Sequence, residues 1–248
     1  MLQRILRLLD PPAEERIEVI HLGRIYPVVI RRSPQAKRYT LRVKTATREA
    51  VLTMPMRGNL ITARDFAIRH GGWLAARYAR MPAMVDFVMG AQVPLRGTLH
   101  RIDHREKARG TVWTETGPDG HPVLAVAGDA SFLARRVRDF LKREARKDID
   151  AAARKHAETL GVTIKRIAIK DTKSRWGSCA ADGSLSFSWR MILAPPFVLD
   201  YLAAHEVAHR VEMNHSPRYW RVVASVFPDF ERAEAWLKRH GAELHRWG

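Results

Sequence analysis

Cysteine is almost absent from this chain of 248 residues, in which Cys179 is the single example. One cysteine excludes an internal disulfide framework and favours a reducing compartment. Long hydrophobic runs are also missing, since no apolar stretch approaches the roughly 20 residues that cross a bilayer. The apolar stretch 1–9 is interrupted by Arg4 and Arg7 and lacks a small-residue cleavage site, unlike a signal peptide. We therefore expect a cytoplasmic protein that does not enter the membrane.

Acidic residues are scarce relative to basic ones. The 43 Lys and Arg residues against 26 Asp and Glu residues give a formal net charge of +17. Such a surface attracts polyanions, which leaves nucleic acid or another polyanion open as a partner. A generally Arg-rich composition explains the excess equally well. A phosphate loop of Walker type is missing from the sequence, which weakens a role in nucleotide hydrolysis.

The most specific pattern is the His-Glu-x-x-His motif of residues 205–209, which lies within an apolar helical pattern. Positions i and i+4 of a helix share one face, so His205 and His209 can direct two imidazoles to one point. Zn²⁺ accepts such nitrogens at about 2.0–2.1 Å. Glu206 is then expected over the open side of the metal, as the base for an attacking water. A helix with incidental histidines is the alternative for the bare motif.

His215 is the expected third ligand. A straight helix would carry this side chain away from the first two histidines. Asn214 tolerates the left-handed conformation that ends helices, so a turn at Met213 and Asn214 would return His215 to the metal. Three histidines with one open position are typical of a catalytic zinc, whereas a structural zinc has four protein ligands.

The first part of the chain is predicted to be rich in β-strands. Strands are expected at 17–20, 26–30, 39–43 and 50–54, within 84–98, and in a hairpin around a turn at 117–120. One helix is expected over 62–81, capped by Asn59 or Thr62. The basic segment 31–38 is expected to be a solvated loop. His100 and His104 resemble a second metal cluster, although a polar edge strand explains them equally well.

The second part is predicted to be mostly helical. A long amphipathic helix is expected over 129–158, capped by Asp129 or Ser131 and ended by Gly161. A strand at 162–170 and another at 184–191 flank a tight turn and lead into the motif helix. Further helices are expected from Ser216 and over 229–240, the last one ended by Gly241. We place the domain boundary between residues 1–128 and 129–248.

Two segments resemble the YgjP-like metallopeptidase family, which is related to SprT-like and WLM-type zinc proteases. They are Arg-Trp-Gly-Ser-Cys at 175–179 and the pattern from His205 through Trp220, and the strong similarity covers 173–227. The resemblance implies an α+β fold, in which a β-rich N-terminal region precedes a zincin-like helical domain with a small antiparallel sheet beside the active-site helix. It also implies zinc held by His205, His209 and His215, with Glu206 as the catalytic acid/base.

Two comparisons limit this resemblance. Related families often carry Asn on the strand before the zinc helix, where this chain has Ser188 and Trp189. The metzincins share the ligand spacing but have Gly at the position of Glu212, and no methionine follows His215 to form their Met-turn. We therefore exclude the metzincins.

The predicted function is a zinc-dependent metallopeptidase acting on a protein or peptide, with Glu206 taking a proton from the activated water and delivering it to the leaving amine. The hairpin beside the motif helix is expected to hold an extended peptide by strand addition. Three alternatives stay open: a zinc-dependent hydrolase of a nucleotide phosphoanhydride, a DNA-associated protease of SprT-like type, and a nucleic-acid-binding module with a structural zinc. Glu206 argues against the last, because a structural site needs no general base.

Overall fold

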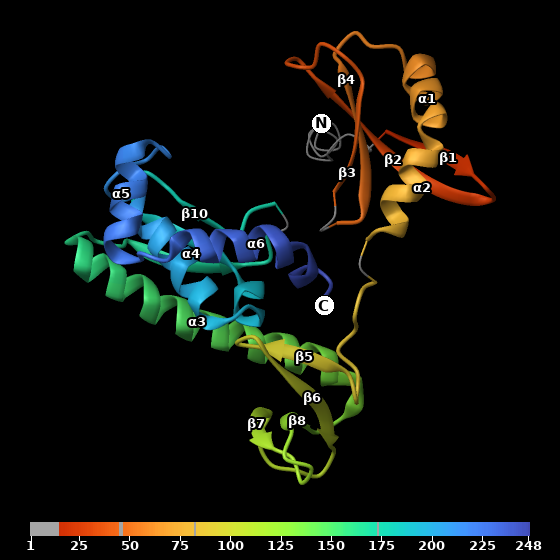
Figure 1. Ribbon diagram of the computed structural model, residues 1–248. Helices are drawn as coiled ribbons and strands as arrows, with labels where there is room; N and C mark the ends of the chain where they lie inside the picture. The colour runs from red at the N-terminus through yellow and green to blue at the C-terminus, as the bar shows by residue number, and fades with distance from the viewer. Residues whose placement is uncertain (1–14, 45–46, 82, 173) are drawn as a thin grey trace, which may run out of the picture. The chain divides into compact units, whose positions relative to one another are not determined.

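In a computed structural model of the protein, the residues described are 15–44, 47–81, 83–172 and 174–248. Its internal contacts divide the chain into two compact units, 1–81 and 82–248. Both units combine helices with strands, so the fold class is α+β (Figure 1). Within the described residues, no helix is both long and apolar enough to cross a membrane.

The first unit is a four-stranded sheet with two helices packed against one face. The strand order is β1-β2-β4-β3, in which β2 and β4 run parallel and the other neighbours antiparallel. The elements are β1 (Arg16–His21), β2 (Arg24–Ser33), β3 (Thr40–Lys44), β4 (Glu49–Pro55), α1 (Leu60–Arg69) and α2 (Gly71–Ala79). Alternate residues of β2 and β4, such as Ile30 and Leu52, meet Ala67 and Leu74 of the helices in one hydrophobic core.

The single helix predicted over 62–81 is in fact two helices. Asn59 caps α1, because its side chain accepts a hydrogen bond from the Ile61 backbone N–H at 2.7 Å. The helix stops at His70, whose ring Nδ1 lies 2.7 Å from the Phe66 carbonyl oxygen. Gly71 then begins α2 in close contact with β1, where a Cβ would lie 3.3 Å from His21. A side chain at position 71 would crowd this contact between α2 and β1.

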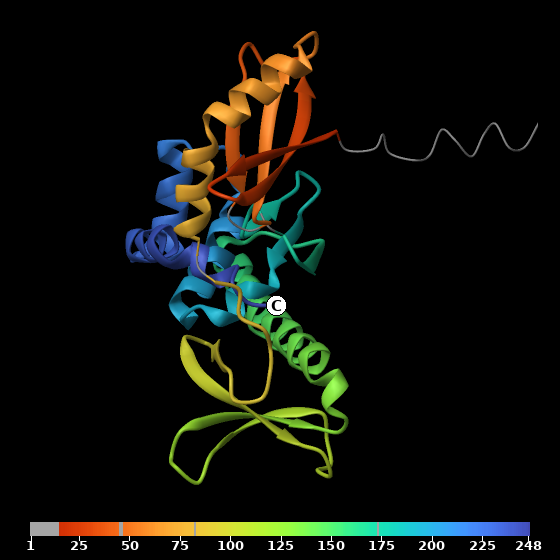
Figure 2. The ribbon, with the colours of Figure 1, turned by 90° about the vertical axis from the view of Figure 1, so that its right-hand side faces the viewer.

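The second unit contains two further sheets and the long helices. Its elements are β5 (Gln92–Leu95), β6 (Thr98–Arg105), β7 (Val112–Thr116), β8 (Pro122–Ala127), the 3-10 turn η3 (Ala130–Phe132), α3 (Leu133–Leu160), β9 (Arg166–Lys170), β10 (Gly177–Cys179), β11 (Ser184–Ser188), the 3-10 turn η4 (Trp189–Leu193), α4 (Pro196–Ala208), α5 (Pro217–Val226) and α6 (Phe230–Leu244). One sheet has the order β5-β6-β8-β7 and the other β10-β11-β9. The β5–β8 sheet lies at the N-terminal end of α3 (Figure 2).

The boundary between the units differs from the one predicted at 128–129. Leu124 and Val126 of β8 share a hydrophobic core with Val137 and Leu141 of α3 and with η4 and α4. The β5–β8 sheet therefore belongs with the helices that follow it. The sequence pattern changes from strands to helices after Val126. The hydrophobic core nevertheless continues across this position, so the change of secondary structure is not a domain boundary.

Several elements end where predicted and two do not. Gly161 ends the long helix as predicted, with a φ of 63°, whereas Asp129 caps the preceding 3-10 turn η3 by accepting from the Ser131 backbone N–H at 2.7 Å. The strand predicted over 184–191 ends at Ser188, because the next residues form η4. The last helix passes through Gly241 to Leu244. Gly241 is buried there, and a Cβ on it would lie 3.3 Å from the Trp176 ring.

Candidate active site

Helix α4 carries the motif and is buried on nearly all sides. Pro196 occupies its first turn, where the missing N–H is tolerated. The buried residues of α4 are Val198, Leu199, Tyr201, Leu202, Ala203, Ala204, Glu206, Val207 and Ala208. They pack against α3 on one side and against α5 and α6 on the other. A helix enclosed in this way holds its last-turn side chains in fixed positions.

The chain leaves α4 earlier than predicted. The helix ends at Ala208 with His209 as its C-cap, and a turn follows in which the Glu212 N–H bonds the Ala208 carbonyl oxygen at 3.0 Å. Asn214 is not among the described residues with positive φ, so the predicted left-handed turn is wrong. Instead the Asn214 side chain accepts from the Ser216 N–H at 2.9 Å and shapes the entry to α5.

The three predicted histidines come together. One nitrogen from each of His205, His209 and His215 lies within 4.8 Å of the other two. The Nε2 atoms of His205 and His215 are 3.2 Å apart. Two nitrogens of a tetrahedral zinc site, each about 2.0–2.1 Å from the metal, lie about 3.3 Å apart, so this spacing fits a metal. Within the described residues His100 and His104 belong to no such group.

Two of the three rings are oriented by a hydrogen bond at Nδ1. The Nδ1 of His209 lies 3.1 Å from the backbone oxygen of Glu212, which leaves Nε2 free to bind a metal. The Nδ1 of His205 lies 3.2 Å from the Tyr201 hydroxyl oxygen, and that hydroxyl donates to Glu234 Oε1 at 3.2 Å. These contacts fix the neutral tautomer that metal binding requires.

Tyr219 of α5 supports the cluster from behind. Its hydroxyl donates to the His205 backbone oxygen at 3.0 Å, and its ring stacks on His209 with centroids 4.5 Å apart. Tyr219 is fully buried. Burial raises the pKa of this phenol, which therefore stays protonated and remains a hydrogen-bond donor at neutral pH.

Burial also sets the charge of His205 and His209. It lowers the pKa of His205 to about 4, with smaller contributions in the same direction from His209 and His215. Burial lowers the pKa of His209 as well, against the effect of its bond to Glu212. Both rings are therefore neutral at pH 7, which is the form that binds a metal.

Glu206 lies beside the cluster with only 4% of its surface exposed. Burial raises its pKa to about 8, while the positive charge of Arg175 acts in the opposite direction. A cation held by the histidines would favour the charged carboxylate. The side chain passes directly over β10, where a Cβ on Gly177 would lie 2.7 Å from both Cγ and Cδ of Glu206. Only glycine at 177 leaves room for the carboxylate.

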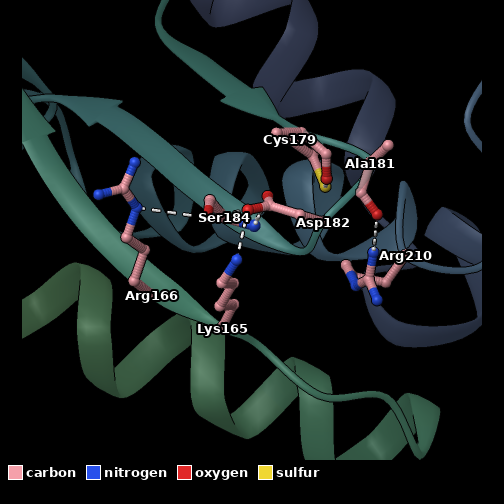
Figure 3. A network of polar contacts seen from close by, with 8 residues as sticks. Lys165, Arg166, Cys179, Ala181, Asp182, Ser184 and Arg210 are labelled. Atoms are coloured by element: carbon pink, nitrogen blue, oxygen red, sulfur yellow. Dashed lines mark hydrogen bonds and ion pairs between the residues drawn. The ribbon is translucent and has the colours of Figure 1, made fainter.

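A polar network connects the end of the motif helix to the β9–β11 sheet (Figure 3). Arg210 follows the second histidine and donates to the carbonyl oxygens of Ala181 at 3.1 Å and Thr163 at 3.2 Å. Asp182 in the same turn binds Lys165 Nζ at 2.9 Å and also accepts from the Ser184 N–H. Through these contacts the β10–β11 turn is joined to Arg210, which follows α4, and to Lys165, which precedes β9. β10 also contacts α4 directly.

The sheet beside α4 is antiparallel only in part. β10 and β11 form the predicted antiparallel hairpin, whereas β9 pairs with β11 in parallel. β10 is the edge strand of this sheet, since the order is β10-β11-β9. One side of β10 is therefore unpaired within the described sheet.

A cavity of about 250 Å³ opens next to the cluster. Its lining residues are Trp176, Gly177, Tyr201, Leu202, His205, Glu206, Glu234 and Leu237. Sequence reasoning did not assign a site role to Tyr201, Tyr219 or Glu234. Tyr201 precedes His205 by four residues, a spacing that signals contact on a helix. Tyr219 and Glu234 carry no comparable signal, because α5 and α6 bring them close only in the folded chain.

The first unit has a cavity of a different kind. It measures about 790 Å³ and is formed by the β2–β3 connection and the exposed face of β3 and β4. Its lining includes Lys37, Arg38 and Arg42 together with the hydroxyls of Ser33, Thr40 and Thr53, and it contains no carboxylate. Within the described residues these three cations form no ion pair. The basic cavity, as we call this site, covers part of the segment predicted to be a solvated loop.

Of the comparisons with known proteins, the match to a family model identifies the family of this chain. A solved structure of a metallopeptidase zymogen, abylysin from Pyrococcus abyssi, is 24% identical, covers 40% of this chain and 96% of its own, and gives a TM-score of 0.35. A comparison with curated protein sequences found no match. The model of the YgjP-like metallopeptidase domain matches residues 37–240, which include the histidine cluster and its surroundings. Because this match covers most of the sequence, the chain belongs to the YgjP-like family and is a metallopeptidase.

Proposed function

We propose that the metal of this peptidase is Zn²⁺, that His205, His209 and His215 bind it, and that Glu206 is the general base. The convergence of three histidine nitrogens within 4.8 Å carries this proposal. Neutral imidazoles are good ligands for zinc, and three of them leave a fourth position open. When bound, zinc acts as a Lewis acid and lowers the pKa of water to about 7.

Glu206 performs the proton transfers in this proposal. Its carboxylate is held over the site by burial and by the absence of a side chain at Gly177. It accepts a proton from the attacking water, holds it on a carboxylate oxygen, and donates it to the nitrogen of the departing amine. The tight surroundings keep the carboxylate from rotating away between the two transfers.

The unpaired side of β10 is the proposed platform for the substrate backbone. An extended peptide can add to it as a further strand, with its N–H and C=O groups bonded to Gly177 and Cys179. The scissile bond then runs past Glu206, which touches Gly177. The surroundings favour a peptide over a nucleotide, because Glu206 and Glu234 both line the adjacent cavity and repel phosphate.

The decisive experiment compares Glu206→Gln with the wild type on unfolded protein substrates. The substitution keeps the shape and removes the base, so hydrolysis should fall by about 10²–10⁴-fold or more while zinc content is unchanged. Glu231→Gln is the matched control, since this exposed residue lies in the first turn of α6 and outside the cavity. Wild-type activity in the Glu206→Gln protein would remove Glu206 from the mechanism.

A polyanion-binding role is a second candidate, and the basic cavity supports it. Three cations and three hydroxyls without a carboxylate suit the oxygens of a nucleic-acid backbone. Binding through such a surface should be tolerant of sequence and sensitive to salt. Titration of a labelled oligonucleotide at low and moderate salt tests it. The absence of measurable binding at low salt would contradict both this proposal and the alternative of a DNA-associated protease.

A further inference from the structure

We propose that the cavity beside Glu206 receives the side chain of a substrate residue next to the scissile bond, and that Glu234 selects lysine or arginine there. This inference rests on the peptidase function proposed above. The cavity shares Glu206 and His205 with the reaction site. A side chain that enters it therefore belongs to a residue adjacent to the bond under attack.

One wall of the cavity is the Trp176 ring, which is held in place from behind. His245 stacks on it with centroids 4.5 Å apart and planes inclined by 22°. Gly241 allows α6 to approach the same ring, because a Cβ there would lie 3.3 Å away. Leu202 of α4 and Leu237 of α6 supply further apolar surface. Such walls suit the aliphatic stem of a long side chain.

Glu234 supplies the charge in the cavity. Its Oε1 accepts the Tyr201 hydroxyl at 3.2 Å, and a carboxylate has room for several donors. Although the chain has 43 Lys and Arg residues, no ion pair to Glu234 occurs within the described residues. A carboxylate left unpaired in so basic a protein is available to a cation from outside. An apolar stem with a cationic end matches the walls and Glu234 together.

If Glu234 only positioned Tyr201 and His205, its hydrogen-bond acceptor would matter and its negative charge would not. The Tyr201–His205 contact needs an acceptor at Oε1, and an amide oxygen serves as well as a carboxylate oxygen. Glu234→Gln therefore preserves the support of His205 but removes the negative charge. Tyr201→Phe has the opposite effect, because it breaks the contact to His205 and leaves the charge of Glu234 intact.

The test measures kcat/KM and cleavage sites on matched peptides that carry Lys, Arg, Leu or Glu at the positions flanking one bond. Wild type should prefer Lys and Arg over Leu by about tenfold. Glu234→Gln should lose that preference with zinc content unchanged, whereas Glu231→Gln and Tyr201→Phe should keep it. Equal cleavage of Leu and Lys peptides by the wild type, or an unchanged preference in Glu234→Gln, would overturn the inference while the peptidase function stands.

A binding measurement separates the two proposals further. Zinc-loaded Glu206→Gln should bind a labelled Lys peptide about tenfold more tightly than its Leu counterpart, and the Glu206→Gln/Glu234→Gln double variant should not discriminate. Equal affinity of Glu206→Gln for the two peptides would overturn the inference. Discrimination in binding by a wild type that cleaves no peptide would instead contradict the proposed function, and the cavity would be a binding site for basic peptides only.

Discussion

The histidine site and the basic cavity are built on opposite physical principles. In the histidine site Glu206 and His209 are withdrawn from water, at 4% and 9% exposed, whereas His215 lies at the exposed edge of the cluster. In the basic cavity Lys37, Arg38 and Arg42 are exposed and form no ion pairs within the described residues. The first arrangement gives precise geometry and is sensitive to single substitutions. The second gives a long-range electrostatic attraction. Several residues contribute to it, and dissolved salt weakens it by screening.

The largest effect is expected from the metal ligands. His205→Ala and His215→Ala should each lower zinc affinity by more than the roughly 10–100-fold that the loss of a supporting residue causes. Elemental analysis and chelator competition measure this directly. His100→Ala is the control, because this histidine lies on β6 and belongs to no metal-capable group of the described residues. Full zinc occupancy in either test variant would remove that histidine from the ligand set.

A smaller effect should follow from filling the space beside Glu206. Gly177→Ala places a Cβ 2.7 Å from Cγ and Cδ of Glu206, which is buried and cannot move aside freely. Displacing a catalytic group by about 1 Å can reduce activity by roughly 10²-fold, so kcat/KM should fall by this order with zinc retained. Gly72→Ala is the control, since its Cβ meets the His21 ring at an ordinary 3.5 Å. If Gly177→Ala is as active as Gly72→Ala, Glu206 is not held as described.

The smallest effect is expected in the basic cavity. Lys37→Glu/Arg38→Glu should weaken oligonucleotide binding at low salt by about tenfold and reduce its salt dependence, because each lost phosphate contact changes the slope by about one. Peptide hydrolysis should not change. Arg57→Glu/Arg64→Glu changes the net charge equally, and neither residue lines the cavity. Equal loss of binding in the two double variants would show that total charge decides binding, whatever the location of the charges.

The sequence predicts the parts of the site that depend on local geometry. The i, i+4 spacing of His205 and His209 is a property of one helix, and their convergence follows from it. The strands of the first unit follow from their β-prone and alternating patterns, and Gly161 ends the long helix as predicted, although Asp129 caps a short 3-10 turn before that helix. The cluster of three histidines also forms as the pattern indicates, although the turn that returns His215 differs.

Features that depend on tertiary contacts were not predictable. Glu234 and Tyr201 meet because α6 packs against α4, and neither residue type signals this in the sequence. Gly241 looks like a helix end but serves as the contact point for Trp176, and only the packed structure separates these two uses of glycine. The unit boundary also depends on which core the β5–β8 sheet joins.

The shortness of β10 has a consequence for how the protein avoids associating with itself. An unpaired edge strand exposes N–H and C=O groups to any extended chain, which makes long edges sites of aggregation. β10 spans only Gly177–Cys179 and begins with a glycine, a residue that weakens strands. So few backbone bonds hold a passing strand only weakly. A chain is retained at this edge only when its side chains add further contacts, and this protects the molecule from pairing with copies of itself.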